Sequence, residues 1–97
     1  MPHLIELTYW IDGNQYSADT TIDARDDCQA AASAVIWCNQ QLLARRAFAG
    51  YCYLMGGTDG RSYASGACWS AHGDAIIGAY AVTLTPITGN PQPCTPE

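Results

Sequence analysis

Apolar and polar residues alternate along the first part of the chain. Every second residue from position 5 to position 11 is apolar, and the alternation resumes from position 16 to position 22. A period of two is typical of a strand that buries one face. The intervening Asp12-Gly13-Asn14 suits a tight turn, because glycine and asparagine tolerate positive φ. Residues 4–24 are therefore predicted to form a β-hairpin.

The pattern changes to that of a helix at Asp26. Asp26 and Gln29 have the spacing of a capping box, in which the carboxylate accepts hydrogen bonds from free N-terminal amides and the glutamine reaches back. The alanine-rich run that follows has a high helix propensity, and two arginines near its end suit the negative end of a helix dipole. Gly50 can end the helix. The sequence predicts one helix over residues 27–47.

The two sides of this helix differ in the size of their residues. The side predicted to face the core carries Cys28, Ala31, Ala32, Val35, Cys38, Leu42 and Leu43. The opposite side carries Ala30, Ser33, Ala34, Trp37, Gln40, Gln41 and Ala44. A solvent-facing side usually carries Lys, Glu and Arg, and this one does not. Trp37 is therefore expected to stand on a smooth, nearly uncharged outer side.

The second half of the chain is predicted to form strands separated by turns. Strands are expected at 51–55, 62–70 and 76–84, with a glycine-rich turn at 56–61 and another at 72–74. The element order is then ββαβββ. This order predicts an α+β fold in which an antiparallel sheet is packed on one face by a single long helix.

One domain accounts for most of the chain. Residues 1–86 are predicted to form a single globular α+β domain, since a chain of this length holds about one core. The segment TGNPQPCTPE that ends the sequence has three prolines and no hydrophobic period. Residues 87–97 are therefore expected to be a flexible, proline-rich tail.

The charge balance narrows the classes of function. The net charge is -5, the chain contains no lysine, and only Arg45 and Arg46 are adjacent cations. Nucleic-acid binding relies on a basic patch, so direct binding of DNA or RNA is not expected. No apolar run approaches the ~18 residues of a membrane span, so no membrane partner is expected either. An acidic surface suits a partner whose own surface is basic.

The cysteines and the start of the chain bear on the compartment. Five cysteines are an odd number, and the chain begins with an alternating pattern where a signal peptide would have a basic end and an apolar block. We therefore expect a cytoplasmic protein whose thiols are mostly reduced. Cys28 and Cys38 would lie ~15 Å apart along one helix, beyond the ~7 Å Cα limit of a disulfide.

The stretch SGACWSAH, residues 65–72, raises the question of a reactive thiol. SGACW resembles, over five residues and with one difference, the signature around the nucleophile of papain-like proteases. Those enzymes place the partner histidine over a hundred residues downstream, whereas here the one downstream histidine is His72. On a strand, His72 would lie ~13 Å from Cys68 at ~3.3 Å per residue. Cys68 is therefore expected to be a small buried residue, and a thiol-dependent enzyme using Cys68 is kept as an alternative.

No cofactor or metal is expected. Structural zinc sites usually contain a close cysteine pair, and the only local pair here is Cys68 with His72. A zinc site formed by cysteines that are distant in the sequence is kept as an alternative. The stretch GGTDGRS lacks the spacing and the lysine of a phosphate-binding loop.

Aromatic and acidic residues supply the candidate binding surface. Trp10 is on the strand face opposite the expected core, and tryptophan is a preferred anchor of protein interfaces. The aspartates in the turns and the hairpin would add negative charge. The candidate partner-binding residues are Trp10, Asp12, Asp19, Asp23, Trp37, Gln41 and Asp74.

The ββα start with IDARDDCQAAASAV, the small size and the acidic charge resemble small phage-encoded inhibitors of host defence, including anti-CRISPR proteins. The resemblance is one of size and layout over roughly the first half of the chain. It implies a non-enzymatic inhibitor that docks on a host protein or nuclease complex, with its aspartates facing a basic nucleic-acid channel. A second hypothesis is a homodimeric module whose interface is the Trp37 and alanine side and whose sheet holds a small ligand.

Overall fold

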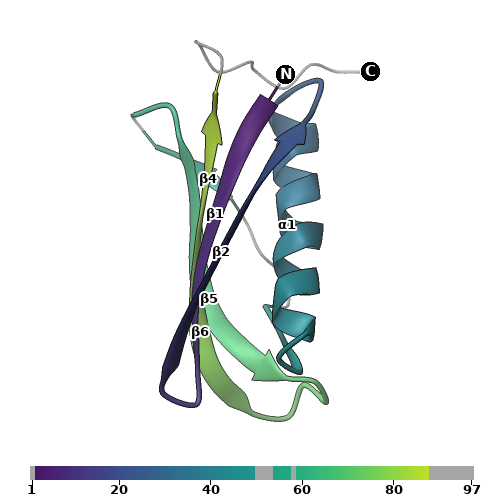
Figure 1. Ribbon diagram of the computed structural model, residues 1–97, viewed down its shortest axis with the longest axis vertical. Helices are drawn as coiled ribbons and strands as arrows, with labels where there is room; N and C mark the ends of the chain where they lie inside the picture. The colour runs from purple at the N-terminus through teal and green to yellow at the C-terminus, as the bar shows by residue number, and fades with distance from the viewer. Residues whose placement is uncertain (1, 50–53, 58, 88–97) are drawn as a thin grey trace.

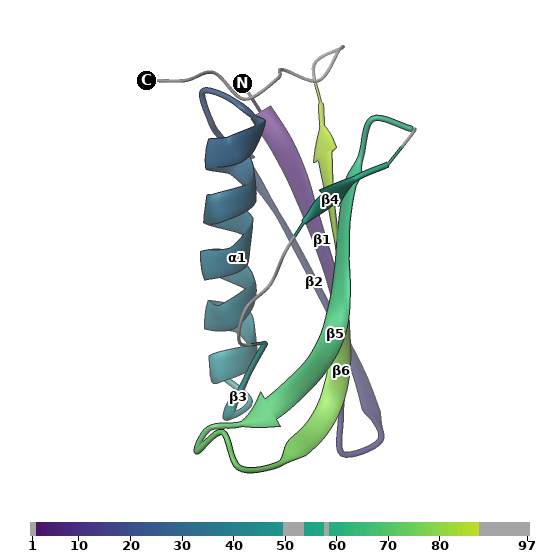
Figure 2. The same cartoon turned by 180° about the vertical axis from the view of Figure 1, so that it is seen from behind.

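The computed structural model describes residues 2–49, 54–57 and 59–87, which form one helix and one antiparallel sheet (Figure 1). The strands follow the order β2-β1-β6-β5-β3, and β4 pairs with β5. The helix lies along one face of this curled sheet (Figure 2), so the predicted α+β class is confirmed. The elements are β1 (Pro2–Ile11), β2 (Asn14–Asp23), α1 (Asp27–Leu43), β3 (Ala47–Phe48), β4 (Met55–Gly56), β5 (Ser62–Ser70) and β6 (Ile76–Pro86).

The predicted N-terminal hairpin is confirmed along its full length. β1 pairs with β2 from Pro2 opposite Asp23 to Ile11 opposite Asn14. Asp12 and Gly13 form the two-residue connection with φ values of 52° and 81°, which is the backbone of a type I′ turn. On its other edge β1 pairs with β6, so β1 lies inside the sheet and β2 forms one edge.

The start of α1 is capped as the sequence predicts. The Asp26 carboxylate accepts a hydrogen bond from the backbone N–H of Gln29 at 2.8 Å. The Gln29 side chain reaches back and accepts from the backbone N–H of Arg25 at 2.7 Å, one residue earlier than the usual capping box. These bonds satisfy amides that have no partner within the helix.

The end of α1 differs from the prediction, because the helix stops at Leu43 and not at residue 47. The backbone N–H groups of Arg45 and Arg46 bond to carbonyls three residues earlier, which tightens the last turn. Arg46 then takes a φ of 57°, and the chain reverses so that Ala47 can pair with Ser70. Pairing at the sheet therefore ends the helix before Gly50, and it creates β3, which the sequence pattern did not predict.

The second half of the chain forms the predicted strand pair β5 and β6. These strands pair from Ser62 opposite Leu84 to Trp69 opposite Ile76, with an irregularity in register between Cys68 and Trp69. Residues 51–53 of the strand expected at 51–55 lie outside the described residues, and β4 begins at Met55. Of the expected tail, only Ile87 is described, and its N–H donates to the carbonyl of Pro2.

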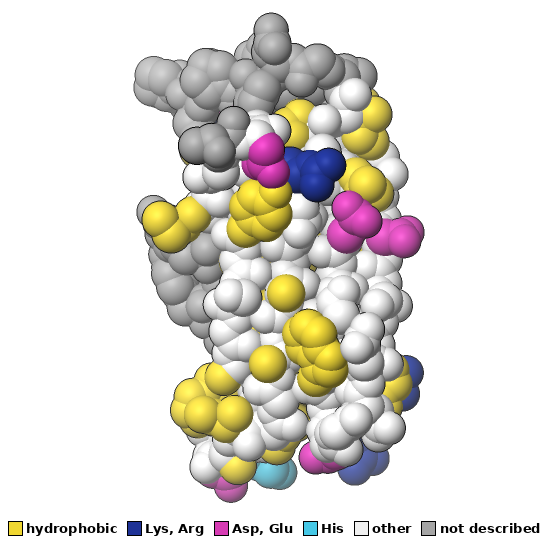
Figure 3. Space-filling model, turned by 90° about the vertical axis from the view of Figure 1, so that its left-hand side faces the viewer, with side chains coloured by type: hydrophobic (Ala, Val, Ile, Leu, Met, Phe, Trp, Pro, Cys, Tyr) yellow, Lys and Arg dark blue, Asp and Glu magenta, His cyan; other side chains and the backbone are white. Residues whose placement is uncertain are grey.

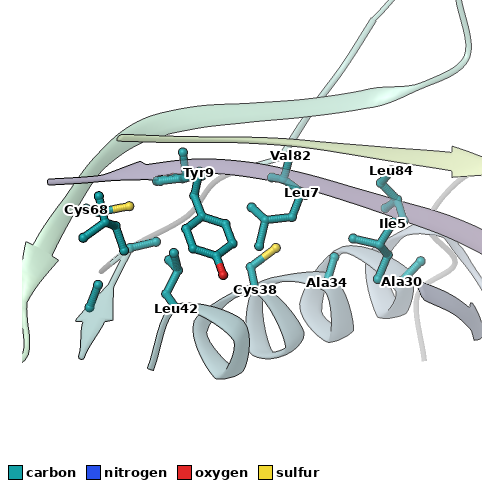
Figure 4. Packing of buried hydrophobic residues seen from close by; sticks show 14 of the residues in the cluster. Ile5, Leu7, Tyr9, Ala30, Ala34, Cys38, Leu42, Cys68, Val82 and Leu84 are labelled. Atoms are coloured by element: carbon teal, nitrogen blue, oxygen red, sulfur yellow. The ribbon is translucent and has the colours of Figure 1, made fainter. Parts of the chain in front are cut away.

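The two faces of the sheet have different surroundings. The inner face meets α1, and the opposite face, which we call the outer face, is open to solvent (Figure 3). Inner-face residues of β1 and β6 are buried, as the period of two predicts for β1: Ile5, Leu7, Tyr9, Ile11, Tyr80, Val82 and Leu84. Figure 4 shows Leu7 and Tyr9 pointing from the sheet toward Cys38 and Leu42 of α1.

The side of α1 that packs on the sheet differs from the predicted one. Its buried residues are Ala30, Ala34, Cys38 and Leu42. The predicted core residues Cys28, Ala32 and Leu43 are exposed, whereas Ala30 and Ala34 had been expected outside. The large inner-face side chains of the sheet leave room only for small residues on the helix, because protein interiors are close-packed.

Gly78 lies where β6 has no room for a side chain beside β1. A Cβ atom placed on Gly78 would lie 1.7 Å from the carbonyl oxygen of Trp10. We expect Gly78→Ala to lower the free energy of unfolding by about 3 kcal/mol or more, since the backbones must separate. Urea denaturation measures this change. Gly56→Ala is the control, because nothing lies within 4 Å of its Cβ position; an equal loss in both variants would contradict the close contact.

Candidate functional site

The predicted partner-binding residues lie in three separate parts of the structure. Trp10, Asp19 and Asp23 lie on the hairpin of β1 and β2, and their side chains are exposed. Asp12 and Asp74 lie in the two turns that connect β1 to β2 and β5 to β6. Trp37 and Gln41 lie on α1, in the other layer. A partner docking on one face therefore meets only part of the predicted set.

The outer face carries most of the exposed aromatic and acidic groups of the sheet. The strand register places two rows of residues across it. One row runs Gln15, Trp10, Ala79, Ala67, and the other runs Asp19, Glu6, Thr83, Tyr63, Met55. Between them lies a row of small residues, Ser17, Thr8, Ala81 and Ser65. Figure 3 shows the result: separate hydrophobic groups stand on this face, with acidic side chains and a Lys or Arg side chain gathered near one of them and uncharged surface over much of the rest.

Trp10 stands on the outer face in a fixed orientation. Its side chain is 39% exposed, and its indole N–H donates to the Gln15 Oε1 at 3.1 Å. Gln15 is the cross-strand neighbour of Trp10 on β2, so a regular sheet position supports the ring. Because the ring is already held in place, a partner that packs on it immobilises few additional torsions.

Glu6 and Asp19 form a like-charge pair on the same face. They are directly opposite each other on β1 and β2, and both are exposed. Like charges at opposed positions destabilise a sheet. Within the described part of the chain, neither carboxylate has a salt-bridge partner. The two carboxylates thus repel each other on the sheet surface, and a cationic group of a binding partner could contact both.

Tyr63 is the second large aromatic residue of the outer face, and its hydroxyl donates to the Asp59 carboxylate. Its side chain is 40% exposed. By strand spacing, Tyr63 lies about 13 Å along the strands and about 10 Å across them from Trp10. A shallow hollow of about 470 Å³ lies beside it, lined in part by Met55, Ser65 and Ala81. The face therefore combines two oriented rings with a small-residue floor.

Glu6 and Tyr63 were not among the predicted site residues. The period of two already placed Glu6 on the face of Trp10, so the pattern contained that signal. The position of Tyr63 relative to Trp10 depends on the pairing of β5 with β6 and of β6 with β1, which sequence periodicity does not give.

Trp37 does not stand on an open surface. Its side chain is half-buried and packs against the buried core, which is contrary to the prediction. Gln41 is also half-buried. The reason is the rotation of α1: with Ala30 and Ala34 against the sheet, the neighbouring Trp37 turns toward the core as well.

Asp12 and Asp74 have structural roles in the turns that contain them. Asp12 occupies the first of the two left-handed positions of the type I′ turn, and its N–H donates to the Ile77 carbonyl at 3.3 Å. The Ser70 hydroxyl donates to Asp74 Oδ1 at 2.6 Å across the turn between β5 and β6. Both aspartates are exposed, but their positions are explained by turn geometry alone.

Cys68 is a buried residue of β5. Its side chain is fully inaccessible, and burial raises the pKa of its thiol. A reactive cysteine needs a lowered pKa and access to solvent. His72 lies in the exposed turn after β5. Among residues 2–49, 54–57 and 59–87, no three His, Cys, Asp or Glu side chains form a group that could hold a metal ion.

The cysteines are not all reduced. Cys28, on the exposed side of α1, is disulfide-bonded, so the expectation of mostly reduced thiols does not extend to this residue. Neither Cys38 nor Cys68 forms a disulfide, so the predicted exclusion of a bridge between Cys28 and Cys38 is confirmed. Cys52 and Cys94 lie outside the described residues.

Comparison of the chain with protein-family models, with curated proteins and with solved structures gave no match. In the described part of the chain, no helix is long and apolar enough to cross a membrane.

The bond between Tyr63 and Asp59 predicts a pH effect. It raises the pKa of Tyr63 above its ordinary value of about 10 and lowers the pKa of Asp59. Its stabilising contribution is therefore lost as pH rises through the raised pKa of Tyr63, and also as pH falls through the lowered pKa of Asp59. In a spectrophotometric titration, referenced to Tyr63→Phe, we expect Asp59→Asn to shift the ionisation of Tyr63 to lower pH. An unchanged midpoint would show that the bond is absent in solution.

The disulfide at Cys28 predicts the thiol content. Because Cys28 is disulfide-bonded, the unfolded, unreduced protein should expose fewer free thiols than its five cysteines. Ellman titration in denaturant counts them, and Cys28→Ser should raise the count by one by releasing its partner while removing no free thiol. Five thiols in freshly purified wild-type protein would contradict the bridge.

Proposed function

We propose that this protein is a small acidic binding protein that docks on a basic surface of a partner protein through the outer face of its sheet. The observation that carries the proposal is the combination of oriented aromatic rings with an unneutralised carboxylate pair on one rigid face. The carboxylate pair is unfavourable in an isolated domain and becomes favourable when a cationic group covers it, and the rings offer apolar area that a partner can bury.

The aromatic rings supply the apolar part of the proposed interface. Trp10 and Tyr63 each present a large surface whose orientation is fixed by a hydrogen bond within the protein. Tryptophan and tyrosine are enriched among interface residues that contribute most to affinity. Trp10 and Tyr63 are far enough apart that a partner contacting both would extend across several strands. The small residues between these two rings would let that partner approach the sheet backbone closely.

The carboxylates supply the charged part of the interface. Glu6 and Asp19 stand on the same row as Tyr63, and the chain carries a net charge of -5. An arginine or lysine from a partner placed between them would relieve their repulsion. Complementary charge of this kind raises association rates and selects the partner.

The class of partner follows from the same charge. Proteins that handle nucleic acids carry the basic surfaces to which an acidic face is attracted. The proposal therefore extends to inhibition of a nuclease or of a nuclease complex, in which this protein occupies a basic nucleic-acid channel. The resemblance to phage-encoded inhibitors of host defence, anti-CRISPR proteins included, supports the same reading.

The cytoplasmic location stays a prediction. A disulfide at Cys28 favours an oxidising compartment, because cytosolic thiols are normally kept reduced.

The alternative of a thiol-dependent enzyme using Cys68 gains no support from the structure, because the thiol is buried and its pKa is raised.

The proposed function is tested by partner capture followed by affinity measurement. Tagged protein retrieves partners from a bacterial lysate, mass spectrometry identifies them, and titration calorimetry gives the dissociation constant for the purified partner. We expect Trp10→Ala to weaken binding by about 30-fold or more, as loss of an interface anchor does. Glu6→Gln with Asp19→Asn should slow association and reduce its salt dependence.

The controls separate binding from folding. Glu6→Gln with Asp19→Asn removes a like-charge pair, so these variants should be at least as stable as the wild type. Ala44→Ser changes an exposed side chain at the end of α1, in the other layer, and should bind as the wild type does. The proposal fails if the outer-face variants bind normally, or if Asp12→Asn and Asp74→Asn weaken binding while the outer-face variants do not.

A further inference from the structure

The side of α1 that faces away from the sheet has two prominent apolar side chains. Ile36 is 62% exposed and Leu43 is 65% exposed. They flank a hollow of about 530 Å³ whose lining is Val35, Ile36, Asn39, Gln40, Leu43 and Phe48. The seven-residue spacing of Ile36 and Leu43 places them on one line along the helix. We call Ile36, Gln40, Leu43 and the hollow the α1 seam.

The α1 seam is electrically neutral on an acidic protein. From Cys28 to Ala44 the chain has no Asp, Glu, Lys, Arg or His, although its net charge is -5. An exposed helix side of a small domain normally carries charged residues that keep it soluble and separate from other molecules. A uniformly neutral helix side therefore needs an explanation other than solvation.

We infer that the α1 seam is the contact between two copies of this chain, arranged as an antiparallel pair of helices around a two-fold axis at Gln40. An axis near Gln40 places Ile36 of one copy opposite Leu43 of the other, because Ile36 lies four residues before Gln40 and Leu43 lies three residues after it. Ile36 of each copy then enters the hollow of the other copy beside Leu43. Such a contact is self-complementary, as a two-fold interface requires.

The charge distribution favours the α1 seam as the surface on which two copies of the chain meet. Two molecules with a net charge of -5 repel each other wherever their acidic faces meet, and the outer face of the sheet is one of those faces. The α1 seam is the helix side on which two copies approach without opposing carboxylates. A basic partner would instead be drawn to the outer face, where Glu6 and Asp19 lie.

The geometry of this dimer leaves the outer faces free. The α1 seam lies in the helix layer and the outer face is on the opposite side of the sheet (Figure 1). Each copy would therefore present its outer face away from the dimer contact, and the pair would be bivalent. This inference does not rest on the proposed function, since the two surfaces are separate.

The oligomeric state tests the inference directly. Sedimentation velocity should show a species of twice the 10.4 kDa of one chain at high protein concentration and a monomer on dilution. Ile36→Glu places a carboxylate in the seam and should raise the dimer dissociation constant by about 30-fold or more. Thr21→Glu adds the same charge at an exposed position of β2 and should have little effect. Circular dichroism confirms that both variants are folded.

Cross-linking tests the position of the axis. Gln40→Cys places a thiol next to its own copy, so mild oxidation should yield a covalent dimer, and Thr21→Cys is the matched control. A monomer at every concentration overturns the inference. So does a dimer that Ile36→Glu leaves intact, or one that cross-links through Thr21→Cys, because that result places the contact on the β2 edge.

Discussion

Close contact between a small-residue side of α1 and the large side chains of the inner sheet face is the constraint on which the rest of the structure depends. Ala30, Ala34 and Cys38 let the helix approach the sheet, while Ile5, Leu7, Tyr9 and Val82 fill the space between the layers. This pairing of small with large residues fixes the rotation of the helix about its axis. The rotation in turn decides which helix residues reach solvent, and so it turns Trp37 inward and Ile36 and Leu43 outward.

The two layers leave two surfaces of different character. The outer face of the sheet has rings held by hydrogen bonds and a pair of opposed carboxylates, and it suits a charged partner. The outward side of α1 has aliphatic side chains without charge, and it suits a neutral, self-complementary contact. In the two proposed contacts, this separation of charge would keep partner binding and self-association on different faces, since each contact is attractive only on its own face.

Periodicity predicted more of the hairpin than of the helix. A one-residue shift of β1 would move Ile5 and Leu7 to the outer face, so the alternation specifies its buried side without ambiguity. The pattern along the helix does not distinguish a buried side from an exposed side in this way. Its residues are nearly all apolar or neutral, and a hydrophobic pattern without charges does not mark the solvent side, which is why the predicted core side was rotated from the observed one. The capping pair Asp26 and Gln29 was predicted correctly, because helix capping depends only on residues that are close in the sequence.

Local chemistry in the sequence determined the hairpin, its type I′ turn, the start of α1 and the α+β class, because each depends on neighbouring residues or on a simple period. Three features were decided only by tertiary structure. Pairing of Ala47 with Ser70 ended the helix early, packing against the sheet chose the buried helix side, and the register of β6 between β1 and β5 brought Tyr63 onto the face of Trp10. Each depends on contacts between residues distant in the chain, whose partners no local pattern specifies.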